Sequence, residues 1–523
     1  MTLNLKFNHN FINALQGDPI IENYTRQVPK ACYSKVEPEK FDTANVIAIS
    51  LDAAAEIDLD KNLFDTPEFN QFFTGQKIYD DMTPYAMCYG GHQFGNWANQ
   101  LGDGRAIILG DITTKADKKI CLQLKGAGST PYSRSGDGYA VLRSSVREFL
   151  CSEAMHYLGV PTTRAISLAL SGEEVYRDMM YDGNGAYEDG AIVCRTAPSF
   201  IRFGNFEILA ARKELGLLKE LVDFTITEHF SHLGTPSKDT YLKWYKEVCK
   251  TSADMVVHWL RVGFVHGVMN TDNMSIHGLT IDYGPYGWLE DYDLDWTPNT
   301  TDASYKRYAY GQQAHMVNWN LVQLANAIYP LIEDTDALQE ALDFFADYYK
   351  SEWNKMMAKK LGWSEYKESD QALVASLIHL LTSVETDMTL FFRGLAKIDH
   401  TLKYDEIPQD LVDCYYDEDL SSDYIVKCCA WLNSYIERCA KDEVSTEARA
   451  KNMNSVNPKF VLRNYLSQLA IDKANENDYT MIHELLEVLK RPYDEQTGKE
   501  FFARKRPDWA KDKPGCSMLS CSS

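Results

Sequence analysis

The chain of 523 residues is 45% hydrophobic and 24% charged, a composition typical of a globular protein. Its 53 Lys and Arg face 75 Asp and Glu, and the net charge of −22 argues against a broad surface for nucleic acid or anionic membrane, because both are polyanions. No apolar run approaches the roughly 18 residues that a membrane span needs. The length allows about three domains, and any phosphate group that the protein binds needs a local cluster of cations.

The cysteines and the N-terminal sequence both indicate a cytoplasmic protein. The twelve cysteines are scattered without the spacing of a zinc site, which is typical of reduced thiols in a cytosol-like compartment. Cys516 and Cys521, near the end of the sequence, are the exceptions. The first residues form no apolar or basic leader, and Asp18 and Glu22 come early, so no secretory or organellar signal is expected.

The first half of the chain predicts two strands and a helix around a glycine-rich region. Residues 105–111 and 120–126 are short apolar runs bounded by Gly and Asp and joined by a polar turn, which is typical of paired strands. Over residues 146–158 the apolar side chains recur on one helical face, and Gly159 with Pro161 ends the pattern. We therefore expect a β-rich first part.

The second half predicts mostly helices. Residues 239–261 follow a helical pattern and lead directly into the segment 266–284, in which residues 275–280 are expected to form a short hairpin. Beyond Gln312 nearly every segment has helical periodicity. The last stretch, 506–523, is rich in Pro, Lys and Ser and is expected to be an exposed tail.

Lys125 ends the second predicted strand, and Glu148 lies in the helix that follows. In protein kinases a strand lysine and a helix glutamate have this arrangement and position the nucleotide phosphates. A lysine beside phosphates needs an acidic partner that fixes its position and keeps its charge. The alternative is a surface lysine and a solvated glutamate, but the segment 266–284 favours the pair.

Two glycine-rich loops, 101–106 and 125–140, surround the predicted strand lysine. Their glycines allow backbone N–H groups to approach phosphate oxygens closely, although neither loop has the Walker A pattern. Within them Arg105 could reach a phosphate or ribose, and Asp137 with Gly138 could contact the polar edges of a nucleotide. The alternative is that the loops are tight connections and that these are exposed turn residues.

Arg195 and Arg202 are embedded in apolar sequence beside Phe200 and Phe203. Guanidinium groups need anionic partners in such surroundings, because an unpaired buried charge is costly. For either arginine alone, an internal salt bridge is the alternative to phosphate binding. The presence of two arginines in the same region as Lys125 favours phosphate binding. Together the three residues supply the local cluster of cations that a chain of net charge −22 needs to bind phosphate.

The segment 266–284, HGVMNTDNMSIHGLTIDYG, resembles the catalytic and metal-binding loop of a protein-kinase-like phosphotransferase. Asn273 and Asp282 match its two metal positions, and their oxygens suit Mg²⁺ or Mn²⁺. Val268, however, occupies the position of the usual catalytic base. Such a chain is either an inactive nucleotide-binding module or an enzyme with different chemistry on the same nucleotide.

Asp272 is the nearby carboxylate that could replace the missing base. A turn-stabilising aspartate is the alternative. His266 is expected to be structural, because an Asn-rich turn needs a hydrogen-bonding anchor. From spacing alone Asp272 is a candidate catalytic residue, and both roles stay open.

Four segments together resemble the selenoprotein O family, and the resemblance covers most of the chain. They are YGGHQFGNWANQLGDGRA, LQLKGAGSTPYSR, SSVREFLCSEAMHYLGVPTTRA and HGVMNTDNMSIHGLTIDYGP. The resemblance implies a kinase-like fold that binds ATP in an inverted orientation, with the γ-phosphate inward, and transfers AMP to protein hydroxyls. If the α-phosphate is attacked, the base need not lie at Val268.

The resemblance also implies roles for individual residues. The family's nucleotide-binding positions match Gly102, Gly104, Arg105, Lys125, Asp137, Gly138, Arg195 and Arg202. Its metal ligands match Asn273 and Asp282, the second of which also lies beside the nucleotide, and its proton acceptor matches Asp272. Glu148 matches the glutamate that pairs with the lysine.

We therefore predict an α+β protein with a protein-kinase-like two-lobed fold: a β-rich N-lobe, a mostly helical C-lobe and an added C-terminal helical region. The expected domains are an N-lobe with an N-terminal extension at 1–190, a C-lobe with the catalytic and metal loop at 191–345, a helical region at 346–500 and a flexible tail at 501–523 that contains Cys516 and Cys521.

The leading functional hypothesis is a cytoplasmic protein adenylyltransferase. It would use ATP with Mg²⁺ or Mn²⁺ and modify Ser, Thr or Tyr hydroxyls of other proteins and of itself. The alternatives are an atypical ATP-dependent protein kinase and an inactive pseudokinase scaffold that binds nucleotide. Neither nucleic acid nor a membrane is an expected partner.

The tail resembles the family as well, because Cys521 occupies a position where some members carry selenocysteine, and a redox role is one hypothesis. Some bacterial members pair a C-terminal cysteine with a position that is Pro298 here, so that disulfide cannot form. Cys516 and Cys521 could form a small loop instead, or be bystanders.

Overall fold

The structure is a computed structural model that describes residue 3 and residues 5–520, and it is an α+β protein, as predicted. The strands are β1 (Phe7–Asn8), β2 (Tyr33–Lys35), β3 (Asn45–Ile49), β4 (Tyr85–Met87), β5 (His92–Gln93), β6 (Asn96–Trp97), β7 (Ala106–Thr113), β8 (Lys119–Lys125), β9 (Ala140–Val141), β10 (Arg164–Arg177), β11 (Ala186–Ala197), β12 (Phe264–Val265) and β13 (Gly287–Trp288). The helices are α1 (Asn10–Ala14), α2 (Leu51–Glu56), α3 (Pro67–Phe73), α4 (Leu142–Tyr157), α5 (Phe203–Ala211), α6 (Leu215–His229), α7 (Lys238–Val262), α8 (Gln313–Ile332), α9 (Thr335–Lys360), α10 (Gln371–Ser383), α11 (Met388–Leu395), α12 (Gln409–Val412), α13 (Ser422–Cys439), α14 (Thr446–Asn454), α15 (Asn464–Ala474) and α16 (Thr480–Leu489).

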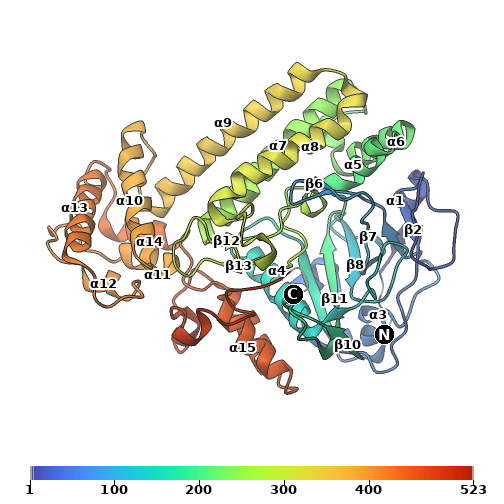
Figure 1. Cartoon of the computed structure of the whole chain (residues 1–523), viewed down its shortest axis with the longest axis horizontal. Helices are drawn as coiled ribbons and strands as arrows, with labels where there is room; N and C mark the ends of the chain where they lie inside the picture. The colour runs from blue at the N-terminus through green and yellow to red at the C-terminus, as the bar shows by residue number, and fades with distance from the viewer. Residues whose placement is uncertain (1–2, 4, 521–523) are drawn as a thin grey trace.

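Figure 1 shows how these elements are arranged. The main sheet lies to the right, the long helices α7, α8 and α9 run together above it toward the left, and α10 to α14 form a separate group at the far left. Among the described residues, no helix is both long and apolar enough to cross a membrane.

The described part of the chain forms one nine-stranded antiparallel sheet, in the order β2-β4-β7-β8-β11-β10-β3, with β1 added at β7 and β9 at β11. The two predicted strands are confirmed as β7 and β8, which pair directly, with Ile107 opposite Leu124. Because successive side chains of a strand point to opposite faces, Ile108 belongs to the core beneath α4, whereas Leu109 belongs to the core beneath α2 and α3. Both faces of the sheet are therefore covered.

The predicted helix at 146–158 is confirmed as α4, which packs against β10 and β11. Its side chains are buried on almost every side, because α15 and α16 cover the face that points away from the sheet. Gly159, at φ +70°, follows the helix in the left-handed conformation that glycine adopts without strain. This packing fixes Glu148 on the sheet side, next to the end of β8.

The segment 266–284 is held between the ends of α7 and β13, but it contains no hairpin, so that prediction is wrong. β12 pairs with β13 and closes the segment at its base. Ser275 instead forms a bridge with Arg202, and Thr280 forms a bridge with Thr162. Because the backbone groups of residues 275–280 bond to these two neighbouring segments, they form no ladder with each other.

The last described residues pack against the molecule, so the prediction of an exposed tail is wrong for them. Leu519 is fully buried, its N–H donates to the carbonyl of Pro298 at 2.8 Å, and its own carbonyl accepts from the N–H of Thr300 at 2.8 Å. Cys516 is only 1% exposed and is a free thiol, whereas Cys521 lies outside the described residues. The polar composition of this stretch is misleading, because its few apolar side chains find a partner surface.

Two of the predicted domain boundaries fall inside regular elements. The boundary between 190 and 191 lies within β11, and the boundary between 345 and 346 lies within α9. The division into lobes therefore stays a prediction.

Candidate active site

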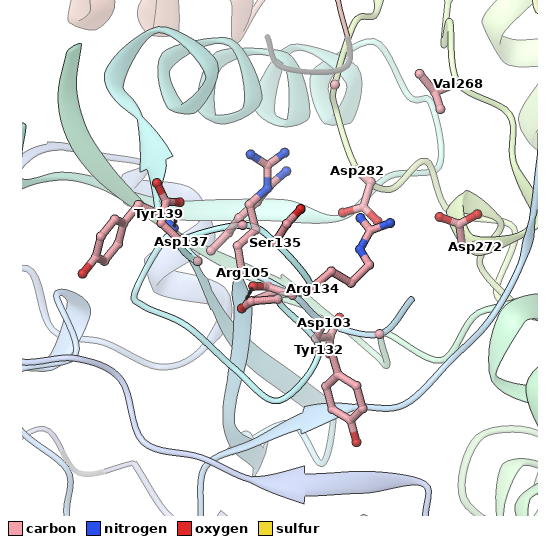
Figure 2. Close-up of a pocket in the computed structure, with 18 of the residues that line it drawn as sticks. Asp103, Arg105, Tyr132, Arg134, Ser135, Asp137, Tyr139, Val268, Asp272 and Asp282 are labelled. Carbon is pink, nitrogen blue, oxygen red and sulfur yellow. Dashed lines mark hydrogen bonds between the residues drawn. The ribbon is translucent and has the colours of Figure 1, made fainter. Parts of the chain in front are cut away.

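One cavity of about 830 Å³ brings together most of the residues singled out in the sequence. The predicted residues that line it are Gly102, Gly104, Arg105, Lys125, Asp137, Gly138, Arg195, Asp272, Asn273 and Asp282. In Figure 2, Asp272 and Asp282 lie on one side of this cavity, and Asp137 with Tyr139 lies on the opposite side. Glu148 and Arg202 are buried behind its wall, where they bind residues that do line it.

The predicted pair of Lys125 and Glu148 is present as a buried ion pair. Nζ of Lys125 lies 2.5 Å from Oε2 of Glu148, and Nη1 of Arg195 lies 2.8 Å from Oε1 of the same carboxylate. Burial lowers the pKa of Lys125, and Glu148 opposes that shift. Burial alone would raise the pKa of Glu148, but Lys125 and Arg195 hold it below its ordinary value. One carboxylate thus fixes two cations at the wall of the cavity, as a phosphate site needs.

Asp282 binds both predicted arginines. Its Oδ1 lies 2.7 Å from Nη1 of Arg195, and its Oδ2 pairs with Nη1 of Arg202. Burial alone would raise the pKa of Asp282, but Arg202 and Arg195 hold it well below the ordinary value. The internal salt bridges that were the alternative to phosphate binding therefore exist. Because the Asp282 side chain is still 21% exposed, a ligand can reach the carboxylate that joins the two arginines.

The backbone of Asp282 is in an unusual conformation. Its φ is +57°, in the left-handed region that residues other than glycine seldom occupy. The guanidinium of Arg202 also donates to the carbonyl of Asp272 at 2.8 Å and lies over the Tyr89 ring at 4.6 Å. Arg202 thus connects the two aspartates of the segment 266–284 and fixes their separation.

Asn273 and Asp282 supply the two oxygen donors predicted for a metal ion. Nδ2 of Asn273 donates to the carbonyl of Val268 at 2.9 Å, which leaves its amide oxygen as an acceptor. Among the described residues there is no group of three or more His, Cys, Asp or Glu arranged to hold a metal. One carboxylate and one amide oxygen fit an ion that takes its other ligands from phosphate and water, as Mg²⁺ does.

Asp272 lies on a short 3-10 turn, η3 (Thr271–Asn273), and its side chain is buried. Its Oδ2 accepts a hydrogen bond from Nε2 of Gln93 at 3.2 Å, and its Oδ1 is buried without a partner among the described residues. Burial raises the pKa of Asp272 to about 7, although Gln93 and Arg202 oppose the shift. A carboxylate of that pKa, with one free oxygen at a cavity wall, is suited to accept a proton.

The turn that carries Asp272 is held from behind. Oγ1 of Thr271 donates to Oε2 of Glu207 at 2.5 Å and accepts from the N–H of His92 at 2.7 Å. Gly91 is in close contact with Asp272, because a Cβ placed on Gly91 would lie 2.6 Å from Oδ1. The position of Asp272 is therefore set by several elements that are distant in sequence.

Val268 and His266 lie where the sequence pattern places them. Val268 lines the cavity with an aliphatic side chain, so no base is present there. His266 is buried, and its Nε2 lies 2.9 Å from the carbonyl oxygen of Ile281. The histidine thus joins the two sides of the segment 266–284, in agreement with the structural role predicted for it.

The predicted glycines allow two loops to pack together. Gly102 has φ +79°, and a Cβ there would lie 2.4 Å from Cγ of Tyr132. Gly138 has φ +83°, and a Cβ there would lie 2.3 Å from the carbonyl oxygen of Gly128. A side chain at Gly102 would push the two loops apart, and a side chain at Gly138 would disrupt the close packing within the loop 125–140.

Several residues of the cavity were not predicted. Arg177 binds the predicted Asp137 through two hydrogen bonds of 2.7 Å, and a sequence pattern gives no signal for this pair. Asp103, whose pKa burial raises to about 6, and Arg134, at φ +56°, both line the cavity. Asp103, Arg134 and Gln93 all lie in the segments that resemble the family. Their location in those segments was the only indication in the sequence that they belong to the site.

Comparisons with known proteins cover the whole site. A family model described as protein adenylyltransferase SelO matches residues 19–490. The chain is 54% identical to the protein nucleotidyltransferase YdiU of Rhodopirellula baltica, with 100% of both chains covered. It is 52% identical to the protein of that name from Azoarcus sp., with 99% of each chain covered, and 51% identical to that from Flavobacterium johnsoniae, with 99% of this chain and 100% of the relative covered. Every residue of the cavity lies within these matches.

Proposed function

Because the chain belongs to the protein adenylyltransferase SelO family, we propose that it transfers AMP from ATP to Ser, Thr or Tyr hydroxyls of other proteins and of itself. The observation that carries this proposal is the single cavity in which a free oxygen of Asp272 lies close to the cations that surround Asp282. The proposal includes a kinase-like arrangement of an N-lobe (1–190), a C-lobe (191–345), a helical region (346–500) and a tail (501–523), and a cytoplasmic location.

The phosphates of ATP would bind at the cationic wall of the cavity. Lys125 and Arg195 are both fixed by Glu148, so their charges are already in place before ATP binds. Arg202, behind Asp282, adds a third cation. With the γ-phosphate inward at these groups, the α-phosphate lies nearer the mouth. Residues Gly102, Gly104, Arg105, Asp137 and Gly138 would then contact the rest of the nucleotide.

Asn273 and Asp282 would hold the metal ion, Mg²⁺ or Mn²⁺. Such an ion would neutralise negative charge on the phosphates of ATP. Asp282 would exchange its contacts with Arg195 and Arg202 for the ion, which leaves both arginines for phosphate. The side chain of Asn273 is already oriented by its hydrogen bond to Val268.

Asp272 would accept the proton of the acceptor hydroxyl at Oδ1, while Gln93 holds Oδ2. The hydroxyl oxygen then forms a bond to the α-phosphorus, the bond from the α-phosphorus to the bridging oxygen breaks, and pyrophosphate leaves with that electron pair. A base at position 268 is not needed for this geometry, which accounts for the valine.

Transfer from two labelled forms of ATP tests the proposal. Label on the α-phosphate should appear on protein, and label on the γ-phosphate should not. Transfer of γ-label would establish an atypical kinase instead. If neither label is transferred although ATP binds in a metal-dependent way, the chain is a nucleotide-binding scaffold.

A further inference from the structure

A second cavity, of about 740 Å³, adjoins the first at Phe94, which lines both. Its other walls come from the segment between β13 and α8, including Tyr305, Lys306 and Arg307. Asp272 and Gln93 line the first cavity next to this shared wall. The second cavity, here called the acceptor groove, therefore meets the first one beside Gln93, which donates a hydrogen bond to Asp272.

Phe94 is held rigidly where the two cavities meet. Its φ is +49°, which is rare and strained for an aromatic residue. Its N–H donates to Oδ1 of Asn270 at 3.2 Å and to the hydroxyl of Tyr308 at 3.0 Å, and its ring packs against Tyr308 at 5.3 Å. A fixed wall beside Asp272 is what a segment that presents one hydroxyl requires.

Arg307 lies at the end of the groove nearest Phe94. The guanidinium of Arg307 lies over the Trp319 ring at 4.6 Å and against Gly95, on which a Cβ would lie 3.4 Å from Cζ. In the described part of the chain, neither Arg307 nor Lys306 forms an ion pair with a carboxylate. Two unpaired cations are unusual on a chain with net charge −22, and they are suited to an anionic ligand.

Asp302 offsets part of the charge of Arg307, which opposes the rise that burial gives the pKa of Asp302, but the Asp302 side chain is fully buried. The carboxylate of Asp302 already accepts from the N–H groups of Arg307 at 3.0 Å and Tyr308 at 2.7 Å. Asp295 lies between Leu294 and Trp296, whose carbonyls accept from the N–H groups of Gly311 and Tyr310. The carboxylate of Asp302 is thus used inside the protein, whereas the side chain of Lys306 is exposed to a ligand.

We infer that the acceptor groove binds the segment of a protein substrate that carries the acceptor hydroxyl, and that Lys306 and Arg307 select a segment with acidic residues beside that hydroxyl. This inference rests on the proposed AMP transfer. The ring of Tyr305, 88% exposed, adds an apolar surface for the same segment. The nucleotide is excluded from the groove because the cations that Glu148 and Asp282 position lie in the other cavity.

Peptide acceptors test the inference. Three sets of synthetic peptides are incubated with the full chain, metal and α-labelled ATP. The central residue in each set is a mixture of Ser, Thr and Tyr, and the flanking residues are Glu in one set, Gln in the second and Lys in the third. We expect the Glu peptide to have the lowest KM. Lys306→Glu should raise that KM about tenfold, lower the KM of the Lys peptide and leave the KM for ATP unchanged. Lys61→Glu, at an exposed lysine of a distant cavity, is the matched control.

Each other outcome overturns the inference in a recognisable way. Equal KM values for the three peptides, or equal effects of Lys306→Glu and Lys61→Glu, exclude selection by this groove while AMP transfer stands. Labelling of proteins but of no peptide excludes recognition of a short segment. If the wild-type chain transfers no α-label to proteins or peptides, the proposed function itself fails. Thermal unfolding of both variants checks that the fold is kept.

Discussion

Gln93 donates a hydrogen bond from Nε2 to Oδ2 of Asp272 over 3.2 Å, while Oδ1 of the same carboxylate is buried without a hydrogen-bond partner among the described residues. A buried oxygen without a partner is unfavourable, and a substrate hydroxyl would remove that cost. The two oxygens of Asp272 therefore differ: one accepts a hydrogen bond from the protein, and the other has no partner among the described residues.

Replacing Asp272 by Asn should separate catalysis from binding. The amide keeps the shape of the side chain and cannot accept the proton, so we expect the rate of AMP transfer to fall by about 10²- to 10⁴-fold. The Kd for ATP with metal, measured by calorimetry, should stay within about twofold of the wild-type value. A rate close to the wild-type rate would instead make Asp272 a residue that only stabilises its turn.

Asp282→Asn should strengthen ATP binding in the absence of metal and abolish metal-dependent AMP transfer. The change removes the anion between Arg195 and Arg202, so ATP in the presence of EDTA should bind more tightly, by about tenfold. Transfer should be lost, because a metal ligand is gone. Calorimetry with and without metal measures both effects. Asp291→Asn, which removes an aspartate–arginine pair outside this cavity, is the control and should retain metal-dependent transfer.

Glu290 should make stability depend on pH. Its side chain is buried, and burial raises its pKa from 4.5 to about 7, although Arg463 and Arg506 oppose the shift. Between pH 4.5 and 7 the folded chain holds a proton that the unfolded chain has lost, so the free energy of unfolding falls as pH rises, by up to about 3 kcal/mol.

Glu290→Gln should remove this dependence. The variant should gain stability relative to the wild type as pH rises from 5 to 8, which urea unfolding at both pH values measures. Glu365→Gln, at a glutamate whose side chain is 68% exposed, is the control. If the difference between Glu290→Gln and the wild type is the same at both pH values, the glutamate is ionised throughout.

Leu519→Ala should destabilise the protein, because the side chain is fully buried in the described tail. Loss of such a side chain costs about 2–5 kcal/mol. The neighbouring Met518 is 36% exposed, and Met518→Ala should change the free energy of unfolding by less than about 1 kcal/mol. Denaturant unfolding of both variants makes the comparison, and equal effects would mean that the tail does not contribute to the cooperative fold.

The sequence was informative where the signal is local. The apolar runs of β7 and β8 and the periodicity of α4 and α7 depend on neighbouring residues, and these elements lie close to where they were predicted. The pairing of Lys125 with Glu148 was also predictable, because a strand and the next helix pack together in a known way.

Contacts between distant segments were not predictable in the same way. Gln93 and Asp272 are 179 positions apart, and nothing in either motif says that their side chains meet. Leu519 is bound by the backbone of Pro298, which is distant in sequence. The composition of the tail contains no sign of that partner, so the tail was predicted to be exposed. The hairpin expected at 275–280 failed for the same reason, since its backbone partners lie elsewhere in the chain.

The pairing of Leu519 with the loop around Thr300 also bears on when the protein becomes active during its synthesis. Thr300 and Leu519 are separated by 219 positions, so ribosomes need roughly 10 to 45 seconds to pass from one to the other. Asn299 supports the carbonyl of Gly267, next to Val268, through a hydrogen bond of 3.0 Å. A nascent chain that already contains every residue of the cavity therefore lacks this part of its support until Leu519 has been synthesised.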